Sequence, residues 1–167
     1  IDALAEAGCE KLNFAGGEPT LRRDLPQLVR WAKELGLVTS IVTNGFRLAE
    51  LLEEHADALD WVGLSVDSGR EDVQAALGRG DGDHVARAMV LADRCREAGV
   101  RVKLNSVVTA LTWDEDMSSL VRAMRPERWK VFQVLPMAGQ NDGRVEDLLI
   151  SQEAFQAFVD RHAHLAE

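Results

Sequence analysis

The chain has 167 residues, 46% of them hydrophobic, which is enough to bury the core of one folded domain. Its formal net charge is −9, so the basic surface of a nucleic-acid-binding protein is not expected. No apolar run reaches the roughly 20 residues that a membrane-spanning helix needs, and no signal peptide is visible, so we expect a cytoplasmic protein. An anionic ligand would have to be bound by a local cluster of cations.

Short apolar or alternating runs take turns with amphipathic stretches along the chain, which predicts strands and helices in alternation. The predicted strands cover residues 11–15, 38–43, 61–66, 100–108 and 129–135. The predicted helices cover residues 24–36, 47–59, 84–99, 113–124 and 151–167, the last with Ser151 as its cap. Strand and helix in alternation imply parallel strands, either in an open α/β sheet or in a (β/α) barrel.

Five strands are too few for a complete eight-fold barrel, which takes about 250 residues. We therefore predict a partial (β/α) barrel of the TIM type, in one domain spanning residues 1–167. The chain begins at Ile1 inside what the pattern indicates is the end of an amphipathic helix. We interpret it as a segment of a longer protein that lacks the first β/α unit and the C-terminal end. Chemistry is expected beyond the C-terminal ends of the strands.

Polar residues recur at one-residue intervals in three of the strands, with an apolar residue between them each time. Residues two apart on a strand share a face, so each polar pair should point away from the helices. For any one pair, cations in solvent at a strand end would be the preferred interpretation. Three pairs with four cations in one interior instead favour a bound polyanion, because the cations would otherwise repel each other. The pairs are Lys11 with Asn13, Lys103 with Asn105, and Arg128 with Lys130.

The first predicted strand ends in “GGEP”, residues 16–19. Gly16 and Gly17 allow backbone geometry and a close approach that a side chain would prevent. Glu18 then places a carboxylate at the C-terminal end of the strand, where it suits an ammonium group. This position after a strand makes the motif more specific than an isolated turn.

The chain resembles viperin-like radical S-adenosylmethionine enzymes in six motifs, which occur in the same order: “KLNFAGGEPTL”, “IVTNG”, “LSVDS”, “GRGDGDH”, “VKLNSVV” and “RWKVFQVLPMAGQN”. The resemblance implies a (β/α)6 barrel whose second to sixth units these motifs match. The first unit, with the CxxxCxxC loop that binds the four-iron four-sulfur cluster, is expected before Ile1. Cys9 and Cys95 are too far apart in the sequence to replace that loop, so no metal ligand or catalytic residue is expected in this segment.

The resemblance also implies two binding sets. The cofactor S-adenosylmethionine would contact Gly16, Gly17 and Glu18 with its amine, Asn44 and Ser65 with its ribose region, and Arg79 with its carboxylate. Its adenine would meet the backbone of residues 132–134. A nucleoside triphosphate would bind Lys11, Asn13, Lys103, Asn105, Arg128 and Lys130.

The implied reaction is a radical dehydration of the nucleotide ribose to a 3′-deoxy-3′,4′-didehydro analogue, an antiviral chain terminator. CTP is the favoured substrate, with GTP or UTP left open, partly because Ala15 stands where animal viperins have a serine. A reductant protein of the ferredoxin or flavodoxin type and a monomeric state are expected. The alternatives are another radical enzyme of this class, peptide-modifying or cofactor-maturing, and a nucleotide-binding barrel that lacks the cluster and catalysis.

Other residues receive structural interpretations. The four tryptophans are assigned to the core, with Trp129 facing the helices. His55 and His84 are assigned to the surface or to helix caps. Asp67 is expected either to orient the end of the Ser65 strand or Arg79, or to play a structural part only.

Overall fold

The computed structural model describes residues 1–137, 139, 141, 143 and 145–165. Five strands form one parallel sheet in the order β1-β2-β3-β4-β5. Their bounds are β1 Lys11–Phe14, β2 Val38–Thr43, β3 Trp61–Ser65, β4 Arg101–Val108 and β5 Arg128–Gln133. Spatial order that follows chain order is typical of a barrel, whereas a doubly wound sheet reverses direction part of the way across. The predicted partial barrel is therefore confirmed.

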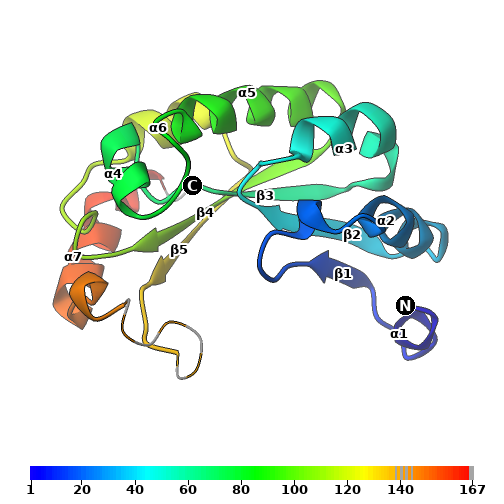
Figure 1. Cartoon of the computed structure of the whole chain (residues 1–167), viewed down its shortest axis with the longest axis horizontal. Helices are drawn as coiled ribbons and strands as arrows, with labels where there is room; N and C mark the ends of the chain where they lie inside the picture. The colour runs from blue at the N-terminus through cyan, green and yellow to red at the C-terminus, as the bar shows by residue number, and fades with distance from the viewer. Residues whose placement is uncertain (138, 140, 142, 144, 166–167) are drawn as a thin grey trace.

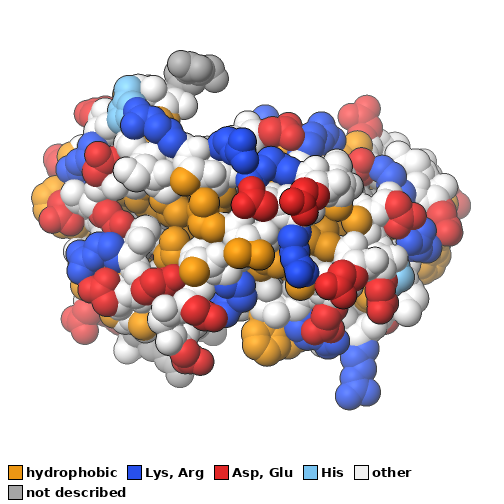
Figure 2. Space-filling view, turned by 90° about the horizontal axis from the view of Figure 1, so that it is seen from above, with side chains coloured by type: hydrophobic (Ala, Val, Ile, Leu, Met, Phe, Trp, Pro, Cys, Tyr) orange, Lys and Arg blue, Asp and Glu red, His pale blue; other side chains and the backbone are white. Residues whose placement is uncertain are grey.

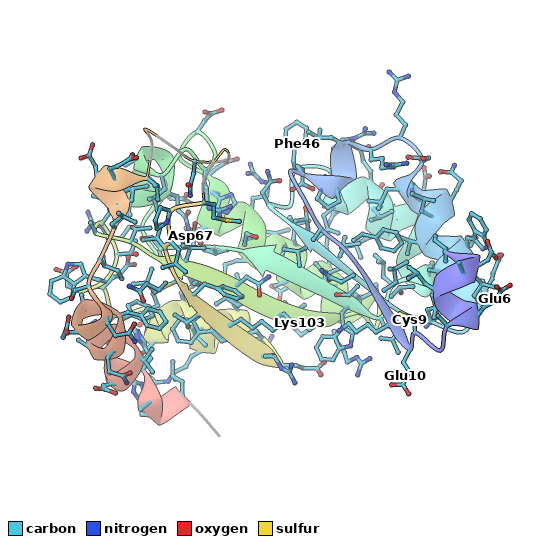
Figure 3. The ribbon with its side chains drawn as sticks, turned by 90° about the horizontal axis from the view of Figure 1, so that it is seen from below. Glu6, Cys9, Glu10, Phe46, Asp67 and Lys103 are labelled. Carbon is cyan, nitrogen blue, oxygen red and sulfur yellow. The ribbon has the colours of Figure 1, made fainter. Side chains whose placement is uncertain are left out.

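Helices lie mainly along one side of the sheet, and the outer strands of the curved sheet bend away from these helices (Figure 1). The helices are α1 Asp2–Glu6, α2 Leu25–Glu34, α3 Leu48–His55, α4 Glu71–Ala76, α5 His84–Glu97, α6 Ser118–Met124 and α7 Gln152–Arg161. Short 3-10 turns are η1 Pro19–Leu21, η2 Ala56–Ala58, η3 Glu146–Leu148 and η4 Ala163–Leu165. The strands are in view from below in Figure 3, and we refer to this side of the sheet as the inner face.

The core lies between the sheet and the helices. Ile41, Val62 and Leu104 on the strands and Val29 and Cys95 on the helices are each fully buried. Successive strand residues point to opposite faces, so these apolar positions leave the residues between them on the inner face. The polar pairs predicted from the sequence occupy such positions, and β5 alternates between exposed and half-buried residues along its whole length.

Some helices and helix boundaries differ from those that the sequence predicted. Helix α4 was not predicted, and the helix expected from residue 113 begins only at Ser118. Its start is fixed by Asp116, whose Oδ1 accepts the N–H of Ser118 at 2.8 Å. Ser151 caps α7 as predicted, accepting from the N–H of Ala154 at 3.2 Å. Residues 166 and 167 of that predicted helix lie outside the described residues, as do residues 138, 140, 142 and 144 of the last motif and its loop.

The helix-covered side carries charges of both signs, intermixed over its surface (Figure 2). Many of them are paired across or within helices, as Arg30 is with Asp57 at 2.9 Å and Arg94 with Glu53 at 3.3 Å. Exposed pairs of this kind add little stability. They do, however, pair opposite charges on the helical side. Within the described residues, no helix is long and apolar enough to cross a membrane.

Candidate functional site

The predicted cofactor residues gather beyond the C-terminal ends of the strands. Gly16, Gly17 and Glu18 follow β1, Asn44 follows β2, and Ser65 ends β3. Arg79 reaches the same edge from the segment between α4 and α5. Gly16 has a φ of +121°, a conformation that a residue with a side chain rarely adopts. The backbone conformation at position 16 therefore favours glycine.

Glu18 is held by hydrogen bonds to both carboxylate oxygens. Its Oε1 accepts the hydroxyls of Thr20 and Thr43, each at 2.6 Å, and the N–H of Thr20 at 2.9 Å. Its Oε2 accepts the N–H of Asn44 at 2.7 Å. Burial alone would raise the pKa of Glu18, but these hydrogen bonds together outweigh it and hold the pKa below the ordinary 4.5. The carboxylate is thus ionised and fixed, and Oε2, which accepts one described hydrogen bond, has the capacity to accept another.

Arg79 is fixed by Asp67, which follows β3. The Nε of Arg79 donates to Oδ2 of Asp67 at 2.5 Å, and Oδ1 of Asp67 accepts the N–H of Val107 at 2.9 Å. Asp67 is only 5% exposed. The described hydrogen bonds use only the Nε of Arg79, which leaves its terminal nitrogens able to bind a ligand carboxylate. Of the two interpretations of Asp67, the structure therefore supports the one in which it orients Arg79.

Asn44 and Ser65 contact different cavities. Asn44, Phe46 and Arg79 line a cavity of about 830 Å³, whereas Ser65 lines one of about 340 Å³. The Oδ1 of Asn44 is already used, because it accepts the N–H of Phe46 at 2.9 Å. The backbone oxygen of Ser65 accepts from Nε2 of His84 at 2.8 Å, and His84 is 1% exposed. The assignment of His84 to the surface was therefore wrong.

The predicted substrate residues occupy neighbouring positions on the inner face. Lys103 pairs in register with Arg128, and Asn105 with Lys130, while Lys11 and Asn13 lie across the sheet on β1. Lys103, labelled in Figure 3, is 8% exposed. Within the described part of the chain, none of these four cations, nor Arg101 beside them, takes part in an ion pair.

The neighbouring cations change the pKa of Lys103. Burial, the contact with Lys11 and the nearby charges of Lys130 and Arg128 lower the pKa of Lys103 from 10.5 to about 7. A lysine amine loses its proton more easily in this way, because positive neighbours disfavour the charged ammonium form. A bound polyanion would reverse the effect, since it favours the charged form.

One cavity joins the two predicted sets. The cavity of about 340 Å³ is lined by Asn13, Asn105 and Lys130 of the substrate set together with Ser65 and Arg79 of the cofactor set. Phe132 lines it as well, and Val134 lines an adjoining cavity of about 560 Å³ that shares Arg79. Within the described residues, the buried Oδ1 of Asn105 has no hydrogen-bond partner. A buried oxygen without a partner is costly unless a ligand or water satisfies it.

The sequence interpretation missed Trp61. It was assigned to the core, but it lies on the inner face with the side chains of Lys11, Arg101 and Lys103 over its ring. Its position four residues before Ser65 on one strand was a signal, because even-numbered separations share a face. Trp129 does face the helices as predicted, with Phe158 and His162 against its ring. Trp31 and Trp113 are exposed rather than in the core.

The cysteines do not fit an iron–sulfur cluster. Cys95 is fully buried on α5, and burial raises the pKa of its thiol to about 12. Cys9 lies just before β1, and its Sγ contacts the backbone oxygen of Lys11 at 3.1 Å. Among the described residues, no group of three histidine, cysteine or acidic side chains can hold a metal ion. A separate hollow of about 430 Å³ between α2 and α3 contains none of the residues predicted to bind a ligand.

Comparisons with known proteins agree with this geometry. The family described as the Radical SAM superfamily matches residues 1–124. The S-adenosylmethionine-dependent nucleotide dehydratase of Flammeovirga pacifica is 42% identical over 167 residues, which cover 98% of this chain and 58% of that protein. The enzyme of the same name from Lacinutrix mariniflava is 39% identical, with 97% of this chain and 35% of that protein covered. The chain thus spans 58% or less of the length of these curated relatives.

A solved structure shares the fold. Streptococcus suis SuiB superposes with a TM-score of 0.75 at 19% identity, covering 99% of this chain and 39% of that one. The sheet order defines this chain as a partial (β/α) barrel, and cavities lie at the C-terminal ends of its strands. The chain belongs to the radical SAM superfamily. That membership implies S-adenosylmethionine and a four-iron four-sulfur cluster as cofactors.

Proposed function

We propose that this protein is a nucleotide dehydratase that removes water from the ribose of a nucleoside triphosphate. CTP is the favoured substrate, with GTP and UTP as alternatives, and the product is the 3′-deoxy-3′,4′-didehydro nucleotide. The observation that carries the proposal is the set of inner-face cations that have no acidic partner among the described residues, next to a cavity that Lys130, Arg79 and Ser65 line. The names of the two relatives, both nucleotide dehydratases, support the same class of substrate.

The described residues fit S-adenosylmethionine. An ionised Glu18 with room at Oε2 suits its ammonium group, and the terminal nitrogens of Arg79 suit its carboxylate. Together with the cluster, whose ligands the described residues do not provide, this cofactor supplies a 5′-deoxyadenosyl radical. Ser65 and Asn105 are paired in register, so the ribose of cofactor and substrate would meet along one row of the sheet.

The substrate residues position the nucleotide and compensate its charge. Lys103, Arg128 and Lys130 would bind the phosphates, and Asn105 would use its unpaired Oδ1 as an acceptor for a ribose hydroxyl. This arrangement fixes the ribose and leaves the chemistry to the cofactor. Overall, the nucleotide loses its 4′ hydrogen and its 3′ hydroxyl. A reductant protein of the ferredoxin or flavodoxin type supplies two electrons, and one proton completes the water.

The deciding experiment uses the full-length protein, purified without oxygen, with its cluster reconstituted. S-adenosylmethionine, dithionite and each nucleoside triphosphate are supplied in turn, and products are identified by mass spectrometry. The proposal expects one triphosphate to lose the mass of one water alongside formation of 5′-deoxyadenosine, on the order of one to one. Formation of 5′-deoxyadenosine with every triphosphate intact would instead indicate a radical enzyme for another anion. Nucleotide binding without 5′-deoxyadenosine would indicate a non-catalytic barrel.

Two variants separate the binding sets. Lys130→Ala should weaken triphosphate binding and spare S-adenosylmethionine, while Glu18→Ala should do the reverse. Equal loss of both ligands in each variant would contradict separate sites. Arg122→Ala is the matched control, because this exposed arginine lies on α6, away from the residues that line the site.

A further inference from the structure

Trp61 forms the floor of one end of the cation cluster. It is the first residue of β3, half-buried on the inner face. The Cζ of Arg101 lies 4.1 Å from its ring centroid, the Nζ of Lys103 4.4 Å and the Nζ of Lys11 5.6 Å. An indole ring attracts cations through its electron-rich face. Trp61 therefore holds three positive groups together where no described carboxylate does so.

This end of the cluster has unused hydrogen-bonding capacity. The Cζ of Arg101 lies over the Trp61 ring, and its guanidinium makes no side-chain hydrogen bond with a described residue, so its N–H donors can bind an anion. Ser40 pairs in register with Trp61 and is 1% exposed. Its Oγ has no hydrogen-bond partner among the described residues. A stacked arginine, two ammonium groups and an unpartnered hydroxyl thus occur together.

The register of the sheet places this end relative to the cofactor residues. Ser65, Asn105 and Lys130 form one row across β3, β4 and β5. Gly63, Lys103 and Arg128 form the next row, and Trp61 and Arg101 form the row after that. Rows two residues apart are about 6.6 Å from each other along a strand, so the Trp61 row lies roughly 13 Å from the Ser65 row. A ribose at the Ser65 row would therefore extend its phosphates toward Trp61.

The middle row is closely packed around Gly63. Gly63 is buried on the inner face, and a Cβ added to it would lie 2.9 Å from Nδ2 of Asn105 and 3.2 Å from Cγ2 of Val42. Its φ is not in the left-handed region, so the need for glycine here is space and not backbone conformation. The side chains of Asn105 and Val42 occupy the space next to Gly63, so a larger residue here would displace the amide of Asn105.

We propose that Trp61 and Arg101, with Lys11 and Lys103, form a subsite for the terminal phosphate of the triphosphate. The subsite makes the length of the phosphate chain a determinant of specificity. Arg101 binds the terminal phosphate directly, and Trp61 acts as a positioning residue that holds the three cations around it. This inference rests on the proposed function, since it assigns one end of the same substrate. A diphosphate would reach Lys103 but not Arg101.

The test measures dissociation constants of CTP, CDP, CMP and inorganic tripolyphosphate with the full-length protein in the presence of S-adenosylmethionine. Arg101→Gln should weaken CTP about tenfold, as expected for one charge-assisted contact, and change CDP and CMP less than about twofold. Trp61→Leu should have the same selective effect, and Trp61→Phe, which keeps an aromatic face, a smaller one. Arg122→Gln, an exposed arginine on α6, is the control and should change none of the four constants.

The outcomes separate this inference from the proposed function. Equal losses for CTP, CDP and CMP in Arg101→Gln and Trp61→Leu would overturn the subsite, because the residues would then act through general charge or folding. If the wild-type protein binds tripolyphosphate but no nucleotide, the proposed function fails. In that case the subsite still requires that Arg101→Gln weakens tripolyphosphate, and unchanged binding overturns it.

Discussion

Asp67 fixes Arg79 through a 2.5 Å contact between Oδ2 and Nε, while its other oxygen accepts the N–H of Val107 at 2.9 Å. One buried carboxylate thus connects the segment between α4 and α5 to strand β4. Arg79 lines three cavities, which are the ones that also contain Asn44, Ser65 and Val134. The orientation of this arginine therefore affects the parts of the proposed cofactor site that Asn44, Ser65 and Val134 line.

Replacing Asp67 by Asn should weaken S-adenosylmethionine binding and lower the free energy of unfolding by about 1–3 kcal/mol, because a buried hydrogen-bonded charge partner is lost. Urea unfolding and isothermal titration calorimetry measure the two effects. Asp83→Asn is the matched control, since Asp83 pairs with Arg87 at an exposed position of the same segment and should cost below about 1 kcal/mol. A similar cost in both variants would contradict the special position of Asp67.

Glu18→Gln should reduce the affinity for S-adenosylmethionine at least about tenfold, because the ammonium group loses its charged partner. Triphosphate affinity should stay within about twofold, since Glu18 lines neither the cation cluster nor the cavity beside it. Glu50→Gln, at an exposed acid paired with Arg47, should leave both constants unchanged. Equal weakening of both ligands by Glu18→Gln would indicate a folding defect in place of a lost contact.

Glu18 also predicts a pH dependence of stability. Its pKa in the folded protein lies below 4.5, so its contribution is fully present above pH 4.5 and is lost as the pH falls through the folded value. Urea unfolding across the acid range should show a steeper decline for the wild type than for Glu18→Gln. Parallel curves for the two proteins would mean that the hydrogen bonds from Thr20, Thr43 and Asn44 do not lower this pKa.

Lys103 should take up a proton when a triphosphate binds. Its pKa is about 7 in the free protein, so above that pH the amine is mostly neutral, and the phosphates favour its charged form. Affinity should fall by up to about tenfold per pH unit above 7 until the pKa in the complex is reached. Calorimetry at pH 8 in buffers of different ionisation enthalpy measures the uptake. Lys103→Arg stays charged and should abolish it; unchanged uptake would assign the proton to another group.

Gly63→Ala should weaken nucleotide binding and leave S-adenosylmethionine binding unchanged, because its Cβ would displace the amide of Asn105. The free energy of unfolding should change by less than about 1.5 kcal/mol, since the strain is offset by the lower chain entropy of alanine. Gly69→Ala is the matched control, with its nearest neighbours at 3.4 Å and 3.7 Å and no positive φ. Nucleotide binding unaffected by Gly63→Ala would show that the position of the Asn105 amide does not matter for the nucleotide.

Local patterns predicted much of this molecule. The alternation of strands and helices indicated a parallel partial barrel, and the two-residue period of “KLN” and “RWK” indicated which side chains share the inner face. Both conclusions depend on neighbours in the chain, because strand residues alternate between faces whatever they later pack against. The glycines and the acid after the first strand predicted a ligand edge there, which stays a prediction.

Such local patterns could not predict the contacts between segments that are distant in the sequence. Trp61 was assigned to the core because a tryptophan is usually apolar packing, yet strands β1 and β4 bring three cations onto its ring. His84 was assigned to the surface or to a helix cap, but it is buried as the first residue of α5, and its Nε2 contacts the backbone oxygen of Ser65. The sequence by itself determined the order of elements and the polarity of each face. Only the tertiary structure decided which residues meet, because register and curvature join strands that lie tens of residues apart along the chain.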